Sequence, residues 1–209
     1  AVEATREAVG CNTNLGIVLL AVPLIHAAQH CMPGDILAHR LQRSLAALTR
    51  DDAEWVYRAI RLAAPGGLGE SPRHDVRETP AVTLLEARRE AAARDRIAYQ
   101  HTHCYADILG PGLVSLHQGR MRWGSETAAV TTAYLGFMAS FSDSHIWRKH
   151  GSSAAGAVRT MAFDCIARLG QCADWTCAKT HLTGLDTTLK STGFNPGTSA
   201  DLTVAAWLA

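Results

Sequence analysis

The stretch "LGIVLLAVPLIHAAQ" (residues 15–29) is the longest apolar run of the chain and points to its fold class. Wound as an α-helix it is apolar nearly all round, which is typical of a helix buried in a protein core. It is interrupted by Pro23 and is shorter than the roughly 20 residues that cross a membrane. Only Arg6 is basic ahead of it, and no cleavage motif of small residues follows, so a secretory signal is not indicated. We expect a buried helix and a cytoplasmic protein.

Helical periodicity dominates the rest of the chain. Apolar side chains recur at helical spacing in residues 36–49 and 53–63, and no sustained alternation or Asn-Gly turn predicts a strand. Further helices are predicted at residues 83–105, 127–140, 154–169, 180–191 and 199–208, separated by turns that contain Pro or Gly. The sequence therefore predicts an all-α fold, with residues 1–209 forming a single multi-helix domain.

The composition is that of an ordinary globular protein. The net charge is +1, which gives no electrostatic reason for binding nucleic acid or a membrane surface. The six cysteines form no C-x-x-C pair, so we expect free thiols that act as small core residues in a reducing compartment. Small residues in the helices at 127–140 and 154–169 permit close packing, either within one chain or across a homodimer.

The first of four polar turns, "CNTNLG" (11–16), precedes the apolar helix. Asn12, Thr13 and Asn14 are all good N-cap residues, but a helix needs only one. The others need hydrogen-bond partners beside a buried helix start, so an elaborate cap and a ligand site both remain open.

The second turn is "APGGLGESPRHDV" (64–76). Gly66 and Gly67 allow backbone N–H groups to approach a phosphate closely, and Asp75 offers a metal ligand. The stretch matches neither a P-loop nor a dinucleotide-binding fingerprint. An ordinary long loop is the favoured alternative.

The third turn is "SDSHIWRKHG" (142–151). His145, Arg148 and Lys149 fall on one face of a helix, and Asp143 stands at its start. Basic groups near an acid suit a polyphosphate with a divalent cation. The alternative is a solvated charged face. We expect Trp147 to be buried, which favours a cleft.

The fourth turn lies in "GFNPGTSADLTVA" (193–205). Asn195, Pro196 and Gly197 shape it, and Thr198 or Ser199 is expected to cap the last helix. A helix N-terminus with free N–H groups attracts anions. Asp201, in the first turn, either faces such a site or only favours the helix dipole.

In this order, these stretches resemble the triphosphoribosyl-dephospho-CoA synthase family, in its shorter branch from archaea and methylotrophic bacteria. The motifs that carry the resemblance are "NTNLGIVLLAVPL" (12–24), "GGLG…DV" (66–76), "EAAARDRIAYQ" (90–100), "DSHIWRKHG" (143–151) and "NPGTSADLTVA" (195–205). They span nearly the whole chain. The family's segment with a Lys-Pro-Gly motif, which precedes the Asn-Thr-Asn turn, is absent from these 209 residues.

The resemblance implies an all-helical fold whose polar loops, at helix N-termini, form a nucleotide pocket. In the family's reaction, a ribose 2′-hydroxyl of 3′-dephospho-CoA attacks C1′ of ATP and displaces adenine. It implies ATP and dephospho-CoA as small-molecule substrates and Mg²⁺ as cofactor, with Asp143 and Asp201 as catalytic carboxylates. Metal ligands would be Asp75, Asp143 and Asp201. Nucleotide and phosphate contacts would come from Asn12, Thr13, Asn14, Gly66, Gly67, His145, Arg148, Lys149, Asn195, Gly197, Thr198 and Ser199.

Two other functions stay open at this point. One is a non-catalytic helical module that binds a nucleotide or CoA. The other is a related transfer to a different acceptor in the biosynthesis of a carrier of one-carbon units.

Overall fold

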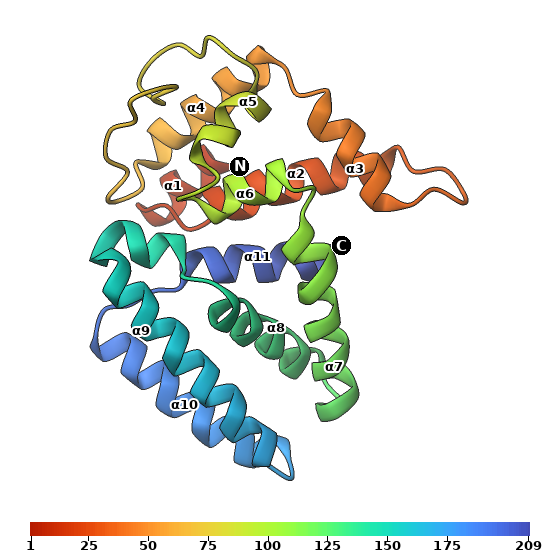
Figure 1. Cartoon of the computed structure of the whole chain (residues 1–209), viewed down its shortest axis with the longest axis vertical. Coiled ribbons are helices and arrows are strands. Elements are labelled where there is room, and N and C mark those ends of the chain that lie inside the picture. Colours follow the sequence, from red (N-terminus) through yellow and green to blue (C-terminus); the bar gives the residue numbers. More distant parts are fainter. The chain divides into compact units, whose positions relative to one another are not determined.

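The computed structural model describes residues 1–209 and consists of eleven α-helices and one π-helical turn, without a strand (Figure 1). The predicted all-α fold is confirmed. None of the helices combines the length and the apolar character that crossing a bilayer requires. The chain divides into two compact units, Ala1–Ala106 and Asp107–Trp207. The single domain remains a prediction.

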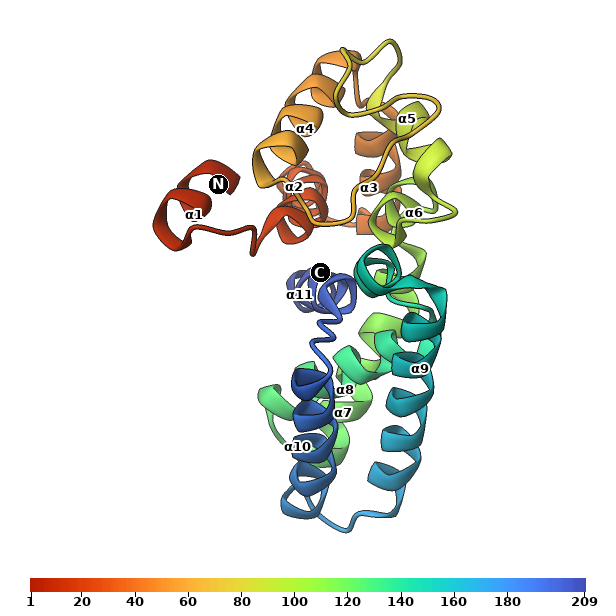
Figure 2. The same ribbon diagram turned by 90° about the vertical axis from the view of Figure 1, so that its left-hand side faces the viewer.

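The first unit is arranged around the helix formed by the apolar run. Its helices are α1 (Val2–Val9), α2 (Leu15–Gln29), α3 (Leu37–Ala46), α4 (Arg50–Ala63), α5 (Leu84–Ala91) and α6 (Arg96–Thr102). Helix α2 packs against α3, α4 and α6 (Figure 2). It buries Leu20, Leu24 and Ala27. Val22 and Ile25 are exposed, so the expectation that α2 is buried all round was wrong.

Two long-range hydrogen bonds reach the carbonyl groups of α2, and Pro23 explains the one at Leu19. Proline has no N–H, so it leaves the carbonyl of Leu19 without its helical donor. The Nε2–H of His101 supplies that donor at 3.0 Å, and the hydroxyl of Tyr105 donates to the next carbonyl, that of Leu20, at 2.9 Å. Both side chains are buried. The segment that follows α5 is thereby tied to the middle of α2.

The single helix predicted for residues 83–105 was wrong, because the chain breaks between α5 and α6. Thr83 and Glu86 form a capping box that starts α5. Asp95 starts a new helix, accepting hydrogen bonds from the N–H groups of Ile97 and Ala98 at 2.8 and 3.1 Å. An internal N-cap thus overrides the uniform helical pattern of the sequence.

The second unit is a set of packed helices. It contains a π-helical turn (Ile108–Gly112), α7 (Leu113–Trp123), α8 (Glu126–Ser140), α9 (Ser144–Gln171), α10 (Trp175–Ser191) and α11 (Gly197–Leu208). Helices α7, α8, α9 and α10 pack successively, and α9 and α10 run antiparallel side by side (Figures 1 and 2). The sequence did not predict α1 or α7.

Small residues bring α7 and α8 close together, as their frequency in residues 127–140 suggested. A Cβ atom added to Gly119 on α7 would lie 2.6 Å from Thr132 Oγ1 and 2.9 Å from the Cα of Ala129 on α8. No side chain fits at that position without movement. The small residues of α7 and α8 therefore allow these two helices of one chain to pack closely.

Helix α9 is two helical segments joined at Gly151. This glycine has φ 86° and ψ 171°, a conformation that a residue with a side chain rarely adopts. The sequence predicted a separate helix from residue 154, and the break at Gly151 lies just before that helix. The short segment before Gly151 carries His145, Arg148 and Lys149 as a unit of its own.

The expectation of six free cysteines was wrong. Cys172 and Cys177 form a disulfide across the turn between α9 and α10, where their Cα atoms lie 5.6 Å apart. The remaining four cysteines are free, and of these Cys165 is buried. The helix–turn–helix geometry, rather than a recognisable sequence spacing, brings the pair together.

Candidate functional site

The starts of α9 and α11 are joined through one buried carboxylate in the second unit. Asp143 Oδ1 accepts hydrogen bonds from the N–H groups of His145 and Ile146, at 2.9 and 3.1 Å. Its Oδ2 accepts from both the N–H and the hydroxyl of Ser199, each at 2.8 Å. Asp143 is 2% exposed and Ser199 is fully buried. One aspartate therefore caps two helices.

Thr198 adds a second link between the same helix ends. Its Oγ1 lies 2.9 Å from the hydroxyl oxygen of Ser144 and accepts a hydrogen bond from the N–H of His145 at 3.1 Å. Thr198 and Ser199 lie inside α11, whose N-cap residue Pro196 makes no side-chain cap bond. The prediction that Thr198 or Ser199 caps the last helix was wrong, because the cap comes from Asp143.

His145 lies at this junction with one nitrogen lacking a partner. Arg148 Nη2 lies 3.5 Å from His145 Nδ1, and because a guanidinium only donates, Nδ1 accepts and Nε2 carries the proton. His145 Nε2 is buried and has no hydrogen-bond partner. Burial, followed by the charges of Arg148 and Lys149, lowers the pKa of His145, so the ring is neutral near pH 7. The junction thus presents an unused N–H donor.

Gly197 allows the imidazole to sit against the start of α11. A Cβ atom at this position would lie 3.1 Å from His145 Nδ1 and 3.2 Å from its Cγ. These contacts are tighter than ordinary van der Waals contacts, so an alanine would displace the ring. Gly197 thus sets the position of His145 by lacking a side chain.

The two predicted cations beside His145 differ in exposure. Arg148 is half-buried and Lys149 is exposed. Trp147 is 45% exposed, so the prediction of a buried tryptophan was wrong and no longer supports a cleft. Asn195 is exposed. Asp201 is half-buried, and because α11 begins at Gly197 it lies in the second turn, so its predicted place in the first turn was wrong.

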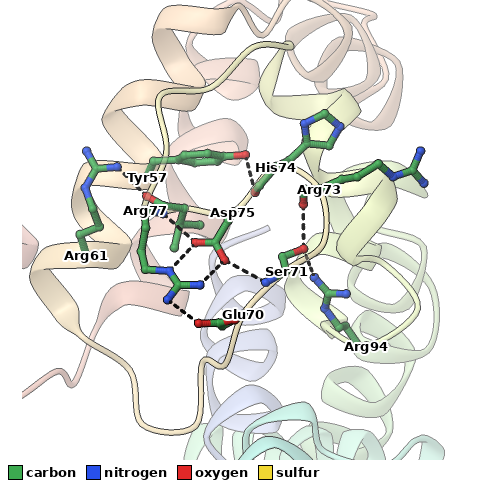
Figure 3. Close-up of polar contacts among 10 residues, drawn as sticks. Tyr57, Arg61, Glu70, Ser71, Arg73, His74, Asp75, Arg77 and Arg94 are labelled. Carbon is green, nitrogen blue, oxygen red and sulfur yellow. Dashed lines mark hydrogen bonds and ion pairs between the residues drawn. The ribbon is translucent and has the colours of Figure 1, made fainter.

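In the first unit, Asp75 organises the loop that contains Gly66 and Gly67. Arg77 donates to both carboxylate oxygens, from Nε to Oδ1 at 2.9 Å and from Nη2 to Oδ2 at 2.8 Å (Figure 3). The N–H groups of Arg77 and Ser71 add bonds of 2.9 and 2.8 Å. The Arg77 guanidinium, with these N–H groups, holds the pKa of Asp75 well below its usual range. Asp75 stays ionised as the anchor of its loop.

Two side chains of α4 hold the far end of this loop. The hydroxyl of Tyr57 donates to the carbonyl of His74 at 2.9 Å, and Arg61 donates to that of Val76 at 2.6 Å (Figure 3). Gly66 and Gly67 are exposed, and Gly67 has φ 72°, in the left-handed region that favours glycine. The loop is long but fixed at the end that carries Asp75.

Neither Asp75 nor Asp143 fits a metal ion in this arrangement. A carboxylate has about four lone-pair positions. Each of these two accepts four hydrogen bonds, all from N–H or O–H groups. A cation at either position would have to displace donors that hold a helix start or a loop.

The Asn-Thr-Asn turn is partly a cap and partly unsatisfied. Asn12 Oδ1 accepts from the N–H of Leu15 at 3.1 Å and so begins α2. Asn14 Nδ2 donates to Thr5 Oγ1 at 2.8 Å, but Asn14 Oδ1 is buried without a partner. Thr13 is exposed. Asn12 thus has the capping role, and Asn14 has an unused acceptor.

The first unit contains a buried cation that the sequence did not predict. Arg88 on α5 is 7% exposed, and its Nε and Nη2 atoms have no hydrogen-bond partner. Burial lowers the pKa of Arg88. The negative charge of Asp95, followed by the hydroxyl groups of Tyr105 and Tyr57, opposes this shift. Only its position on the same helical face as the buried Leu84 could have suggested that Arg88 lies inside.

The second unit also contains a cavity of about 690 Å³ between α7, α8 and α9. It is lined mainly by apolar and small residues, its lining also includes Arg122 and His117, and it has no acidic residue. None of the predicted site residues lines it. The cavity is therefore separate from the junction around Asp143.

Comparison with known proteins places the chain in a family. The family model CitG, ATP:dephospho-CoA triphosphoribosyl transferase, matches residues 1–209. The chain belongs to this transferase family. The resemblance inferred from the five motifs is thereby confirmed, and the chain is an enzyme of the transferase class.

A solved structure supports the fold of this triphosphoribosyl transferase family. The chain is similar to a protein from Archaeoglobus fulgidus, provisionally described as a triphosphoribosyl-dephospho-CoA synthase. The two are 24% identical, with a TM-score of 0.71 over 93% of this chain and 80% of the other. At this identity the likeness concerns the fold alone. Among curated proteins, none matches the chain significantly.

Proposed function

We propose that the protein transfers the triphosphoribosyl group of ATP to 3′-dephospho-CoA. In this reaction the 2′-hydroxyl oxygen of the acceptor ribose forms a bond to C1′ of ATP. The bond between C1′ and N9 of adenine breaks, adenine leaves with the bonding electron pair, and the hydroxyl proton is balanced by protonation of adenine. The family match over the whole chain is the observation that carries this proposal.

The junction of α9 and α11 supplies the polyphosphate contacts of this proposal. His145 Nε2–H is a buried donor without a protein partner, and Arg148 lies beside the same ring. Lys149 adds charge at the surface of the same short helix. Neutral N–H donors and cations together bind phosphate oxygens. The turn before α11 and its first residues support His145 and Arg148 in this role. They are Asn195, Gly197, Thr198 and Ser199.

In the first unit, Asn14 is assigned to a sugar hydroxyl. Its free Oδ1 is an acceptor, which suits the O–H of a ribose and repels a phosphate oxygen. Gly66 and Gly67, which are both exposed, are assigned to a phosphate of either substrate. Asn12, which caps α2, positions this turn, and Thr13 is exposed beside it.

The three predicted acidic residues have two different roles in this proposal. Asp201 is assigned to the reacting ribose, where a carboxylate stabilises positive charge that develops at C1′ or accepts the hydroxyl proton. Asp143 and Asp75 are positioning residues, because their oxygens are occupied. Mg²⁺, when bound, would neutralise charge on the triphosphate, and Asp201 is the remaining predicted protein ligand.

The proposed reaction is tested by release of free adenine. The purified chain is incubated with ATP, MgCl₂ and 3′-dephospho-CoA, and adenine is quantified by chromatography, with the acceptor omitted as control. Adenine that appears only with dephospho-CoA, in equal amount to a triphosphoribosylated product, supports the proposal. ATP binding without adenine release overturns it in favour of a non-catalytic module.

A second experiment tests the identity of the acceptor separately from the transfer reaction. If ATP yields adenine only with another hydroxyl-bearing acceptor, such as one related to carriers of one-carbon units, the transfer stands and dephospho-CoA is overturned. The variant His145→Ala should weaken ATP binding about tenfold. His145→Gln, which retains an N–H donor near the same position, should recover part of the loss.

A further inference from the structure

The turn between α9 and α10 brings two sulfur atoms and an imidazole nitrogen together. The Sγ atoms of Cys172 and Cys177 and a ring nitrogen of His181 all lie within 4.8 Å of one another. Cys172 ends α9, Cys177 lies in the first turn of α10, and His181 follows one helical turn later on the same face. None of the three belongs to the predicted nucleotide site.

Contacts other than the disulfide hold this turn in place. Arg122 Nη2 donates to three carbonyl oxygens at the end of α9, those of Leu169, Gly170 and Cys172, at 2.9, 3.1 and 3.2 Å. At the start of α10, the N–H of Cys177 donates to the carboxylate of Asp174 at 2.8 Å. These hydrogen bonds do not involve sulfur. The two cysteines therefore remain neighbours when the disulfide is reduced.

Aromatic packing supports the same arrangement. The rings of Trp123 and Trp175 lie 5.4 Å apart, and the guanidinium of Arg122 lies 4.5 Å from the ring of Trp123. Trp175 is the first residue of α10, so this contact fixes the direction in which α10 leaves the turn. A preformed turn lowers the ordering cost of binding a ligand there.

The side chains match the ligands that zinc prefers. Zinc binds thiolate sulfur at about 2.3 Å and imidazole nitrogen at about 2.0 Å in a tetrahedral arrangement, which places two sulfurs about 3.8 Å apart. The Cα separation of 5.6 Å is compatible with that spacing as well as with a disulfide. Cys177 is exposed and His181 is half-buried, so the site is reached from solvent. The Asp174 carboxylate adds negative charge beside it.

We propose that Cys172, Cys177 and His181, with a water molecule as the fourth ligand, form a redox-gated site for one zinc-type divalent cation. The disulfide closes the site because both sulfurs are bonded to each other. A thiol or phosphine reductant supplies two electrons, and with two protons the disulfide becomes two thiols. Cation binding then releases these two protons. Once the cation has left, a disulfide oxidant such as oxidised glutathione takes up two electrons and two protons and restores the bond.

The proposal is tested with cobalt as a spectroscopic probe. The full chain is reduced with a phosphine, freed of reductant without oxygen, and titrated with Co²⁺. We expect one equivalent to bind with the sulfur-to-cobalt charge-transfer absorption and intense visible bands of a tetrahedral thiolate site. Zn²⁺ should displace it. The oxidised chain, with four reactive thiols in denaturant instead of six, should show no such absorption.

Single substitutions test which residues bind the cation. Cys177→Ser should abolish the charge-transfer band, and His181→Ala should weaken cobalt binding at least about tenfold. Cys31→Ser, a matched control at a free half-buried cysteine, should leave both unchanged. Circular dichroism checks that each variant folds. The proposal is overturned if the reduced chain binds no cobalt, or if binding survives in Cys177→Ser or is lost in Cys31→Ser.

Discussion

Ser199 donates both its N–H and its hydroxyl to one oxygen of Asp143, each at 2.8 Å, although 56 residues separate them in the chain. The other oxygen of Asp143 serves the start of its own helix. A single buried carboxylate thus fixes α9 and α11 against each other at the ends where both present N–H groups. The anion that these two helix N-termini share is the Asp143 carboxylate itself.

The first prediction concerns the stability of this junction. Ser199→Ala removes one hydrogen bond to a charged acceptor and should lower the free energy of unfolding by about 2 kcal/mol. Asp143→Ala leaves several buried N–H groups without an acceptor and should cost about 3 kcal/mol or more. Urea unfolding measures both. Ser140→Ala, whose hydroxyl bonds an exposed turn of α8, should change stability by less than about 0.5 kcal/mol. Equal effects of Ser140→Ala and Ser199→Ala would contradict the role of the junction.

The second prediction is a pH dependence that arises from His101. Burial, followed by the charge of Arg88, lowers the pKa of His101 to about 3. In the unfolded chain its pKa is about 6.5, so below that pH the unfolded state binds a proton that the folded state does not. Stability should therefore fall as the pH drops below 6.5, by about 2 kcal/mol at pH 5.

His101→Gln isolates this effect. Glutamine retains an N–H donor for the carbonyl of Leu19 but does not titrate. The difference in free energy of unfolding between the two proteins, measured in urea from pH 7.5 to pH 5, should shift steadily in favour of the variant. A difference that does not change with pH would show that His101 is protonated equally in both states.

The third prediction concerns Arg88. A buried guanidinium with two unsatisfied nitrogens is destabilising, because the cost of removing it from water is not offset by hydrogen bonds. Arg88→Met keeps similar volume and should raise the free energy of unfolding by about 1–3 kcal/mol. Arg89→Met, at the exposed neighbouring position, should be nearly neutral. Destabilisation by Arg88→Met would mean that a buried anion or water satisfies the guanidinium.

The fourth prediction tests Asp201 in the proposed transfer. Asp201→Asn removes the carboxylate charge at similar size and should slow adenine release at saturating ATP by about 100-fold, with little change in the KM for ATP. Asp186→Asn, on α10 and paired with Lys190 at 2.7 Å, is the matched control and should retain full turnover. Full activity of Asp201→Asn would contradict a role for its carboxylate in the transfer.

The fifth prediction tests the contact between Gly197 and His145. Gly197→Ala pushes the imidazole by a few tenths of an ångström and should weaken ATP binding about tenfold. Gly184→Ala, on α10 with open space around the new methyl group, should leave ATP binding unchanged and stabilise the helix by about 1 kcal/mol. Isothermal titration with ATP compares the two. Equal ATP affinity in both variants would remove His145 from the site.

Much of the local structure could be read from the sequence. The apolar run at residues 15–29 gave the bounds of α2 directly, and the helical periodicity of residues 127–140 gave those of α8 within one residue. These elements have strong patterns and clear turns at both ends. The break at Asp95 was hidden, because residues 83–105 are good helix formers throughout and only a side-chain cap interrupts them.

The site residues were predicted from the chemistry of their side chains, and the structure gives some of them a different role. His145 and Arg148 meet as their helical spacing predicted. Asp75 and Asp143, chosen as metal ligands, each accept four hydrogen bonds and hold the backbone in place. Sequence shows that a carboxylate is present but not which donors surround it, because those donors come from distant residues.

The sequence by itself determined the fold class, the family and the position of the four polar turns, because periodicity, turn residues and motifs are local properties of the chain. The tertiary structure alone decided that Asp143 caps α11 through Ser199, that Cys172 bonds Cys177, and that Arg88 is buried. Each of these depends on which segments meet in space. In "GFNPGTSADLTVA" (193–205), Thr198 and Ser199 are held by the start of α9, and Asp201 is the residue whose role the turnover of Asp201→Asn decides.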